Sequence, residues 1–185
     1  MHARIFERPA NWNAQRYERV YHDGLFKDML YEEFEEYDEA KTLYDKLDGL
    51  ADIFFITVGA LWKLGEDPYI YLHKSYPEAF NYPATPKYNN GELKRIVNVI
   101  LDLDQLDQLK IALSYLIEAL WEEFSNLGCE EEEAILAIEI ICDSNDTKEL
   151  IALDKHDKGI LKANRFKPPT KRLQLLVESI QDEEI

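Results

Sequence analysis

Apolar side chains recur at intervals of three and four residues along most of the chain, which is the repeat of an amphipathic helix. Phe26, Leu30, Phe34 and Tyr37, for example, fall on one face of such a helix. With only seven Gly and seven Pro among 185 residues, the pattern predicts an all-α protein folded as a helical bundle. We expect helices at about 14–21, 25–40, 43–64, 92–101, 103–126, 130–143 and 171–180.

Two segments interrupt this periodicity. Residues 66–90 hold four of the prolines, and they predict a long loop with room for one short helix. Residues 155–171 contain Gly159 and Pro168-Pro169, and we expect most of this segment to be irregular. No segment shows a clear strand pattern. We therefore predict one domain over residues 1–185, with a loop and helical embellishment at about 66–130.

The predicted helix 43–64 is apolar on nearly all sides, so we expect it to lie at the centre of the bundle. Asp52 lies within it, and Asp48 precedes Asp52 by one turn on the same face. No basic residue occurs between Lys46 and Lys63. An unpaired buried carboxylate is costly, so we expect Asp52 to be neutral, paired with a distant Arg, Lys or Tyr, or bound to a metal ion.

A second group of carboxylates lies on the predicted helix 25–40. Glu32, Glu33 and Glu36 are three or four residues apart and can share one helical face. Like charges at this spacing repel by a few tenths of a kcal/mol per pair, whereas a hard divalent cation would favour the arrangement because Mg²⁺ prefers carboxylate oxygens. Such patterns also arise by chance in acidic chains. Opposite Asp48 and Asp52 in an antiparallel helix pair, however, these glutamates would complete a metal site.

The formal net charge of −16 is unevenly distributed. Residues 155–172 hold seven Lys or Arg and one Asp, a net charge of +6, so the rest of the chain carries −22. The strongly negative net charge argues against a nucleic-acid polymer or an anionic membrane as partner, because binding to either requires a positive field on the protein. The basic segment needs a separate explanation, either as a phosphate-binding element or as a clamp on the protein's own acidic helices.

The sequence also bears on the cellular compartment. The first residues carry charges and no apolar run, and the longest apolar stretch, 53–62, is about half the length of a membrane span. Two cysteines cannot form a disulfide framework. We therefore expect a cytoplasmic protein that does not insert into membranes. The histidines and cysteines show no metal-ligand or nucleophile motif, which disfavours a covalent mechanism.

The order Glu32-Glu33-x-x-Glu36 and then Asp48-x-x-x-Asp52 resembles the signature of the all-α nucleoside triphosphate pyrophosphohydrolases. This superfamily includes MazG-like proteins, dimeric dUTPases and phosphoribosyl-ATP pyrophosphohydrolases, and its signature is Glu-x-x-Glu followed by Glu-x-x-Asp or a near variant. Further along, Ser144-Asn145-x-x-Lys148 and then Lys162-x-x-Arg165-Phe166-Lys167-Pro168-Pro169 resemble segments of the phosphoribosyl-ATP pyrophosphohydrolase-like branch. Both halves occur in the order typical of that branch.

The resemblance implies hydrolysis of a nucleotide between its α and β phosphates, with release of pyrophosphate. It implies Mg²⁺, or alternatively Mn²⁺, held by Glu32, Glu33, Glu36, Asp48 and Asp52, with Glu32 or Glu33 accepting a proton from water. Lys148, Lys162 and Arg165 would neutralise phosphate charge, and Asn145 would hydrogen-bond the nucleotide. The resemblance also implies a bundle completed by oligomerisation, as a homodimer or a dimer of dimers.

A second interpretation remains open from the residues. The chain is then a non-catalytic acidic helical protein that binds basic partners through its charge. This interpretation predicts carboxylates spread over the surface, whereas a hydrolase predicts that they gather at one place. The position of Asp52 in an apolar helix favours the hydrolase.

Overall fold

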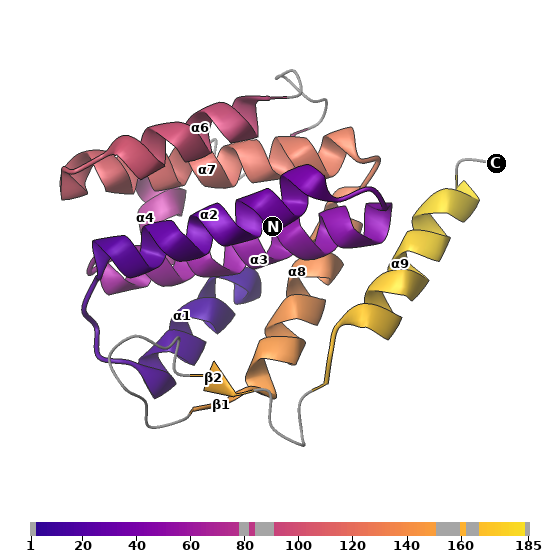
Figure 1. The fold of residues 1–185 in the computed structure, drawn as a ribbon, viewed down its shortest axis with the longest axis horizontal. Helices are drawn as coiled ribbons and strands as arrows, with labels where there is room; N and C mark the ends of the chain where they lie inside the picture. The colour runs from indigo at the N-terminus through magenta and orange to yellow at the C-terminus, as the bar shows by residue number, and fades with distance from the viewer. Residues whose placement is uncertain (1–2, 78–81, 84–90, 151–159, 162–166, 184–185) are drawn as a thin grey trace.

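The computed structural model describes residues 3–77, 82–83, 91–150, 160–161 and 167–183. This part of the chain is almost entirely helical, as the sequence predicts (Figure 1). Its helices are α1 (Arg4–Arg16), α2 (Asp23–Glu39), α3 (Leu43–Lys63), α4 (Pro68–Ser75), α6 (Glu92–Asp102), α7 (Leu106–Asn126), α8 (Glu131–Asp146) and α9 (Thr170–Glu183). Two unpredicted strands of two residues each, β1 (Glu149–Leu150) and β2 (Ile160–Leu161), pair antiparallel with Glu149 opposite Leu161.

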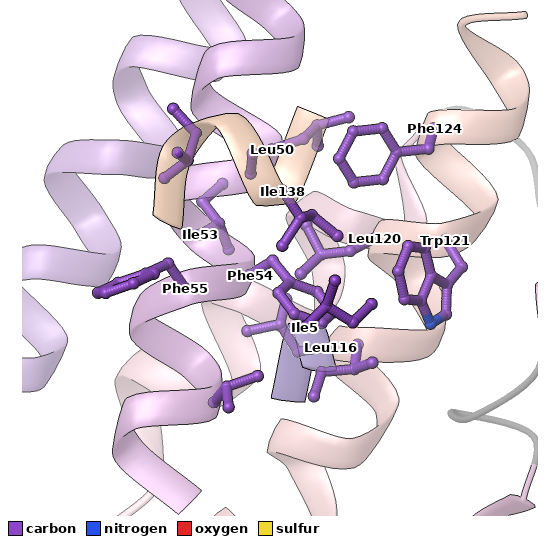
Figure 2. Packing of buried hydrophobic residues seen from close by; sticks show 14 of the residues in the cluster. Ile5, Leu50, Ile53, Phe54, Phe55, Leu116, Leu120, Trp121, Phe124 and Ile138 are labelled. Atoms are coloured by element: carbon purple, nitrogen blue, oxygen red, sulfur yellow. The ribbon is translucent and has the colours of Figure 1, made fainter. Parts of the chain in front are cut away.

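Helix α3 occupies the centre of the bundle and packs against α1, α2, α4, α7, α8 and α9. Its apolar residues are buried around most of its circumference, and Leu50, Ile53 and Phe54 have no exposed surface. The Phe54 ring lies 5.3 Å from that of Phe6, measured between centroids. It lies 5.2 Å from the ring of Trp121, and Figure 2 shows both Phe54 and Trp121 in the core. The predicted central position of this helix is therefore confirmed. Across the described residues, no helix combines the length and hydropathy that crossing a membrane requires.

The first helix differs from the prediction. The sequence predicts a helix at 14–21, but α1 ends at Arg16 and Tyr17 is already extended. The helix instead begins at Arg4 and includes Pro9, a residue that normally disfavours a helix interior. Packing outweighs this preference, because Ile5 and Phe6 are completely buried in the core shared with α3.

The region between α3 and α8 takes part in the core. Asp67 caps α4, since its Oδ1 accepts a hydrogen bond of 2.9 Å from the Ile70 N–H, and Pro68 occupies the first turn. Helix α6 packs on α7 and α2, and α7 packs directly on α3. Leu116, Leu120 and Trp121 of α7 have no exposed surface. Much of the predicted embellishment therefore belongs to the bundle itself.

Helices α2 and α3 form a hairpin that positions the candidate site. The connection is short, and Thr42 begins α3 by accepting a hydrogen bond of 3.1 Å from the Asp45 N–H. Beyond this turn the helices approach closely at Gly49, where an added Cβ would lie 2.9 Å from the Tyr37 Cβ. Residues on the facing surfaces of α2 and α3 are thus brought together near the turn.

Candidate carboxylate site

A cavity of about 380 Å³ opens between the ends of α2 and α3. Most of its lining residues are charged, and only one of them is basic. The lining consists of Glu33, Glu36, Glu39, Ala40, Lys41, Asp45, Asp48, Gly49 and Asp52. The volume falls within the range of small-molecule sites, about 300–1,000 Å³. An acidic cavity of this size can accept a cation or a cation-bearing ligand.

Four of the five carboxylates predicted to bind metal line this cavity. Glu33 and Glu36 come from one face of α2, and Asp48 and Asp52 come from successive turns of α3. Glu32 is exposed and is not among the lining residues. The helix hairpin thus brings together the two acidic patterns of the sequence, with Glu32 at their margin.

Asp52 is the residue most affected by this arrangement. It is partly buried, and its pKa is raised well above 3.8, first by burial and then by repulsion from Glu33, Asp48 and Glu36. The positive charge of Lys148 opposes this rise in the pKa. Ionised Asp52 is therefore disfavoured unless a proton or a cation balances the carboxylates around it.

The acidic residues that line the cavity offer carboxylate oxygens. These are the ligands that a hard divalent cation such as Mg²⁺ prefers. The Asp48 Oδ1 atom is buried and accepts no hydrogen bond within the described residues, although Asp48 does interact with its neighbours. In the part of the chain that the structure describes, no three His, Cys, Asp or Glu residues form a group that could hold a metal ion. Binding would therefore require these carboxylates to draw closer together.

The predicted substrate-binding residues are only partly covered by the structure. Helix α8 continues to Asp146, three residues beyond its predicted end, so Asn145 lies in its last turn and is buried. Lys148 is partly buried, and its N–H donates a hydrogen bond of 3.0 Å to the Asn145 carbonyl oxygen. Lys148 does not line the cavity, but its positive charge lowers the pKa of Asp52. Lys162 and Arg165 lie outside the described residues.

The segment that leads into α9 also approaches this site. The Lys167 N–H donates a hydrogen bond of 2.9 Å to Thr147 Oγ1, next to Lys148. Thr170, the first residue of α9, is hydrogen-bonded to Tyr44 of α3. The end of the basic segment is thereby anchored beside the acidic helices.

Tyr44 is a neighbour of the site that sequence reasoning did not identify. Its pKa is raised, first by burial and then by the nearby Asp48, Asp45 and Asp52, while the hydrogen bond with Thr170 opposes the rise. Tyr44 precedes Asp48 by four residues, so helical spacing could have found it. The spacing of residues along a helix could not have predicted that Lys41 lines the cavity, because Lys41 lies in the turn between α2 and α3.

Comparison of the chain with protein-family models, with curated proteins and with solved structures gives no match. The resemblance to the all-α pyrophosphohydrolases therefore stays a prediction that rests on the motifs.

Proposed function

We propose that this protein is a metal-dependent nucleoside triphosphate pyrophosphohydrolase. It would cleave an NTP, a dNTP or a related nucleotide between the α and β phosphates, giving a monophosphate and pyrophosphate. The observation that carries the proposal is the shared cavity of Glu33, Glu36, Asp48 and Asp52, in which burial first, and then the neighbouring carboxylates, raise the pKa of Asp52. Such a cavity is costly to leave without a balancing cation, and a nucleotide normally arrives with one.

These four carboxylates would hold Mg²⁺ or Mn²⁺, which prefer such oxygen ligands. When bound, the metal supplies charge neutralisation at the phosphate oxygens and lowers the pKa of a bound water. Glu32, exposed at the margin, is the weakest of the predicted ligands. Glu33 lines the cavity, and we assign to it the acceptance of a proton from the attacking water.

The remaining charge of the triphosphate needs cationic side chains from the protein. The charge of Lys148 lowers the pKa of Asp52, and we propose that its ammonium group binds a phosphate that enters the cavity. Asn145 is buried, and its backbone carbonyl oxygen accepts a hydrogen bond from the Lys148 N–H. We therefore propose that Asn145 acts mainly by holding Lys148. Lys162 and Arg165 keep the phosphate role that the resemblance implies.

The direct test is pyrophosphate release from a panel of NTPs and dNTPs in the presence of Mg²⁺. Asp52→Asn and Glu36→Gln should each lower kcat/KM by about 100-fold or more, because each removes charge that the transition state requires. Glu35→Gln is the matched control, since Glu35 lies on the same helix but outside the cavity. Full activity in both cavity variants would overturn the site, and absence of turnover across the panel would overturn the function.

The acidic binding protein is the second candidate, and it is favoured by the lack of a ready-made metal group within the described residues. Thermal unfolding separates the two functions. A ligand that binds only the native state raises the melting temperature, so Mg²⁺ should stabilise the hydrolase relative to chelator at equal ionic strength. No shift together with no nucleotide turnover would favour the binding protein.

A further inference from the structure

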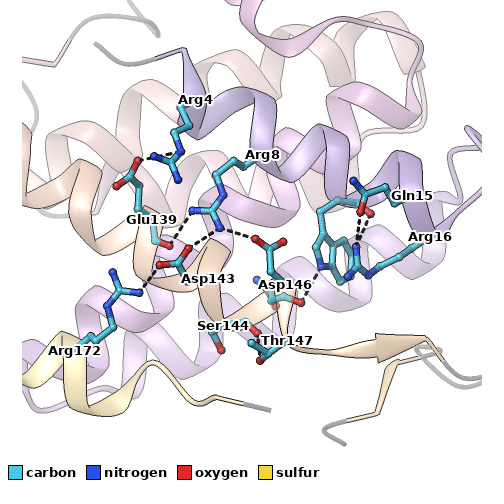
Figure 3. Close-up of polar contacts among 12 residues, drawn as sticks. Arg4, Arg8, Gln15, Arg16, Glu139, Asp143, Ser144, Asp146, Thr147 and Arg172 are labelled. Atoms are coloured by element: carbon cyan, nitrogen blue, oxygen red, sulfur yellow. Dashed lines mark hydrogen bonds and ion pairs between the residues drawn. The ribbon is translucent and has the colours of Figure 1, made fainter. Parts of the chain in front are cut away.

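Arg8 of α1 ties down the last turn of α8 (Figure 3). Its Nη2 lies 2.7 Å from Asp143 Oδ1 and 2.6 Å from Asp146 Oδ2, and its Nη1 donates a hydrogen bond of 3.4 Å to the Glu139 carbonyl oxygen. The Arg8 side chain is only 16% exposed. A planar guanidinium can bond two carboxylates at once, which the single ammonium group of a lysine does less well.

Two further contacts hold the same turn. One helical turn after Arg8, the Trp12 Nε1–H donates a hydrogen bond of 2.9 Å to the Asn145 carbonyl oxygen. From α9, Arg172 pairs with Oδ2 of Asp143, the oxygen that Arg8 does not take. Burial disfavours ionised Asp143, but the hydrogen bonds from Arg172 and Arg8 outweigh this effect and lower its pKa. The end of α8 is thus fixed from two sides.

The position of this turn decides where Lys148 lies. Lys148 lies two residues after the end of α8, and its N–H donates a hydrogen bond to the Asn145 carbonyl oxygen that also accepts one from Trp12. Arg8 does not line the carboxylate cavity. Arg8 therefore acts on the proposed reaction from outside the cavity, and its contacts with the end of α8 connect it to Lys148.

We propose that Arg8 is a positioning residue for the reaction, because it fixes the end of α8 so that Lys148 meets the phosphates of the nucleotide. This inference rests on the proposed function. The ion pairs of Arg8 then do more than stabilise the fold. Their loss should change the hydrogen exchange of the residues after α8 and the value of kcat/KM.

Arg4 provides a matched control. It lies one turn before Arg8 on α1 and also pairs with α8, its Nε being 3.7 Å from Glu139 Oε1. Its side chain is 65% exposed, and Glu139 lies two turns before the end of α8. Arg4→Gln therefore removes an α1–α8 ion pair without touching the last turn.

The first measurement is amide hydrogen exchange in the wild type, Arg8→Gln, Arg8→Lys and Arg4→Gln. The amides of Thr147 and Lys148 are good reporters, because both donate hydrogen bonds to the last turn of α8. Arg8→Gln should speed their exchange, Arg8→Lys should do so less, and Arg4→Gln should leave it unchanged. Unchanged exchange in a folded Arg8→Gln protein would overturn the inference.

The second measurement is kcat/KM for pyrophosphate release in Arg8→Gln, Lys148→Gln and the double variant. Arg8→Gln should lower kcat/KM by about tenfold, as is typical for a residue that supports a site. The double variant should match Lys148→Gln alone, because Arg8 then has nothing to position. Independent, additive losses would overturn the inference while leaving wild-type turnover intact, whereas failure of the proposed function would appear as no turnover by the wild type.

Discussion

Gly49 sets the distance between α2 and α3 beside the carboxylate cavity. An added Cβ would lie 2.9 Å from the Cβ and 3.2 Å from the Cα of Tyr37, so the obstacle is close to the backbone. Tyr37 is also held by its hydroxyl, which donates a hydrogen bond to Glu123 of α7. Gly59 on the same helix instead faces the end of the Asn13 side chain, 2.7 Å away at Nδ2, and a side-chain end moves more easily than a helix.

Gly49→Ala should therefore destabilise the protein. Alanine gains about 1 kcal/mol of helix propensity, but overpacking against Tyr37 typically costs about 1–3 kcal/mol and forces the two helices apart. Urea unfolding at neutral pH measures the change in the free energy of unfolding. Gly59→Ala is the control and should cost less, and a Gly49→Ala protein as stable as the wild type would contradict the close approach of α2 and α3.

Asp52 makes the stability of the metal-free protein depend on pH. Because its folded-state pKa is raised well above 3.8, the folded state binds this proton more tightly than the unfolded state, and the stability from this group falls as pH rises. Asp52→Asn removes the repelled charge. In chelator at neutral pH, the variant should thus unfold at a higher temperature than the wild type.

The difference between Asp52→Asn and the wild type should shrink as the pH is lowered through the raised folded-state pKa of Asp52, and it should vanish below 3.8, where Asp52 is protonated in both states. Melting curves across this range, with Glu35→Gln as a control that removes a carboxylate outside the cavity, check the prediction. A variant less stable than the wild type at neutral pH would mean that a partner other than a metal satisfies Asp52.

At the scale of helices, the hydropathy pattern predicts α2, α3, α7 and α8 well, because each presents a long apolar face. It fails at α1, where Pro9 interrupts the pattern and only packing of Ile5 and Phe6 maintains the helix. The candidate site, too, could be predicted from the sequence only in part. Spacing along α2 and α3 predicts the facing carboxylates, whereas Arg8 and Asp143 are 135 residues apart and local pattern says nothing of their pairing.

Helix α9 packs its apolar face on α3 and α8. Leu173 is completely buried, whereas Leu175 is 57% exposed. Leu173→Ala should lower the free energy of unfolding by about 2–5 kcal/mol because it leaves a cavity, and Leu175→Ala should change it by about 0.5 kcal/mol or less. Chemical denaturation of both variants measures these values, and equal effects would show that α9 does not dock as described.

At the scale of the whole molecule, the resemblance predicts association of identical chains. The described surface of α6 and α7 carries exposed apolar side chains, with Val99 43%, Ile111 41% and Tyr115 53% exposed. Light scattering should give a mass of at least twice the 21.7 kDa of one chain. A mass of one chain at micromolar concentration would contradict the prediction.

The carboxylate of Asp143 joins the first helix of the chain to the last, since it pairs with both Arg8 and Arg172. This has a consequence for biosynthesis. Arg8 is made 135 residues before Asp143, which at bacterial or eukaryotic translation rates of about 5–20 residues per second is a delay of roughly 7–27 s. The contacts of Asp143 with Arg8 and Arg172 are therefore among the last to form, and a nascent chain contains the α2–α3 hairpin well before these contacts can hold the end of α8.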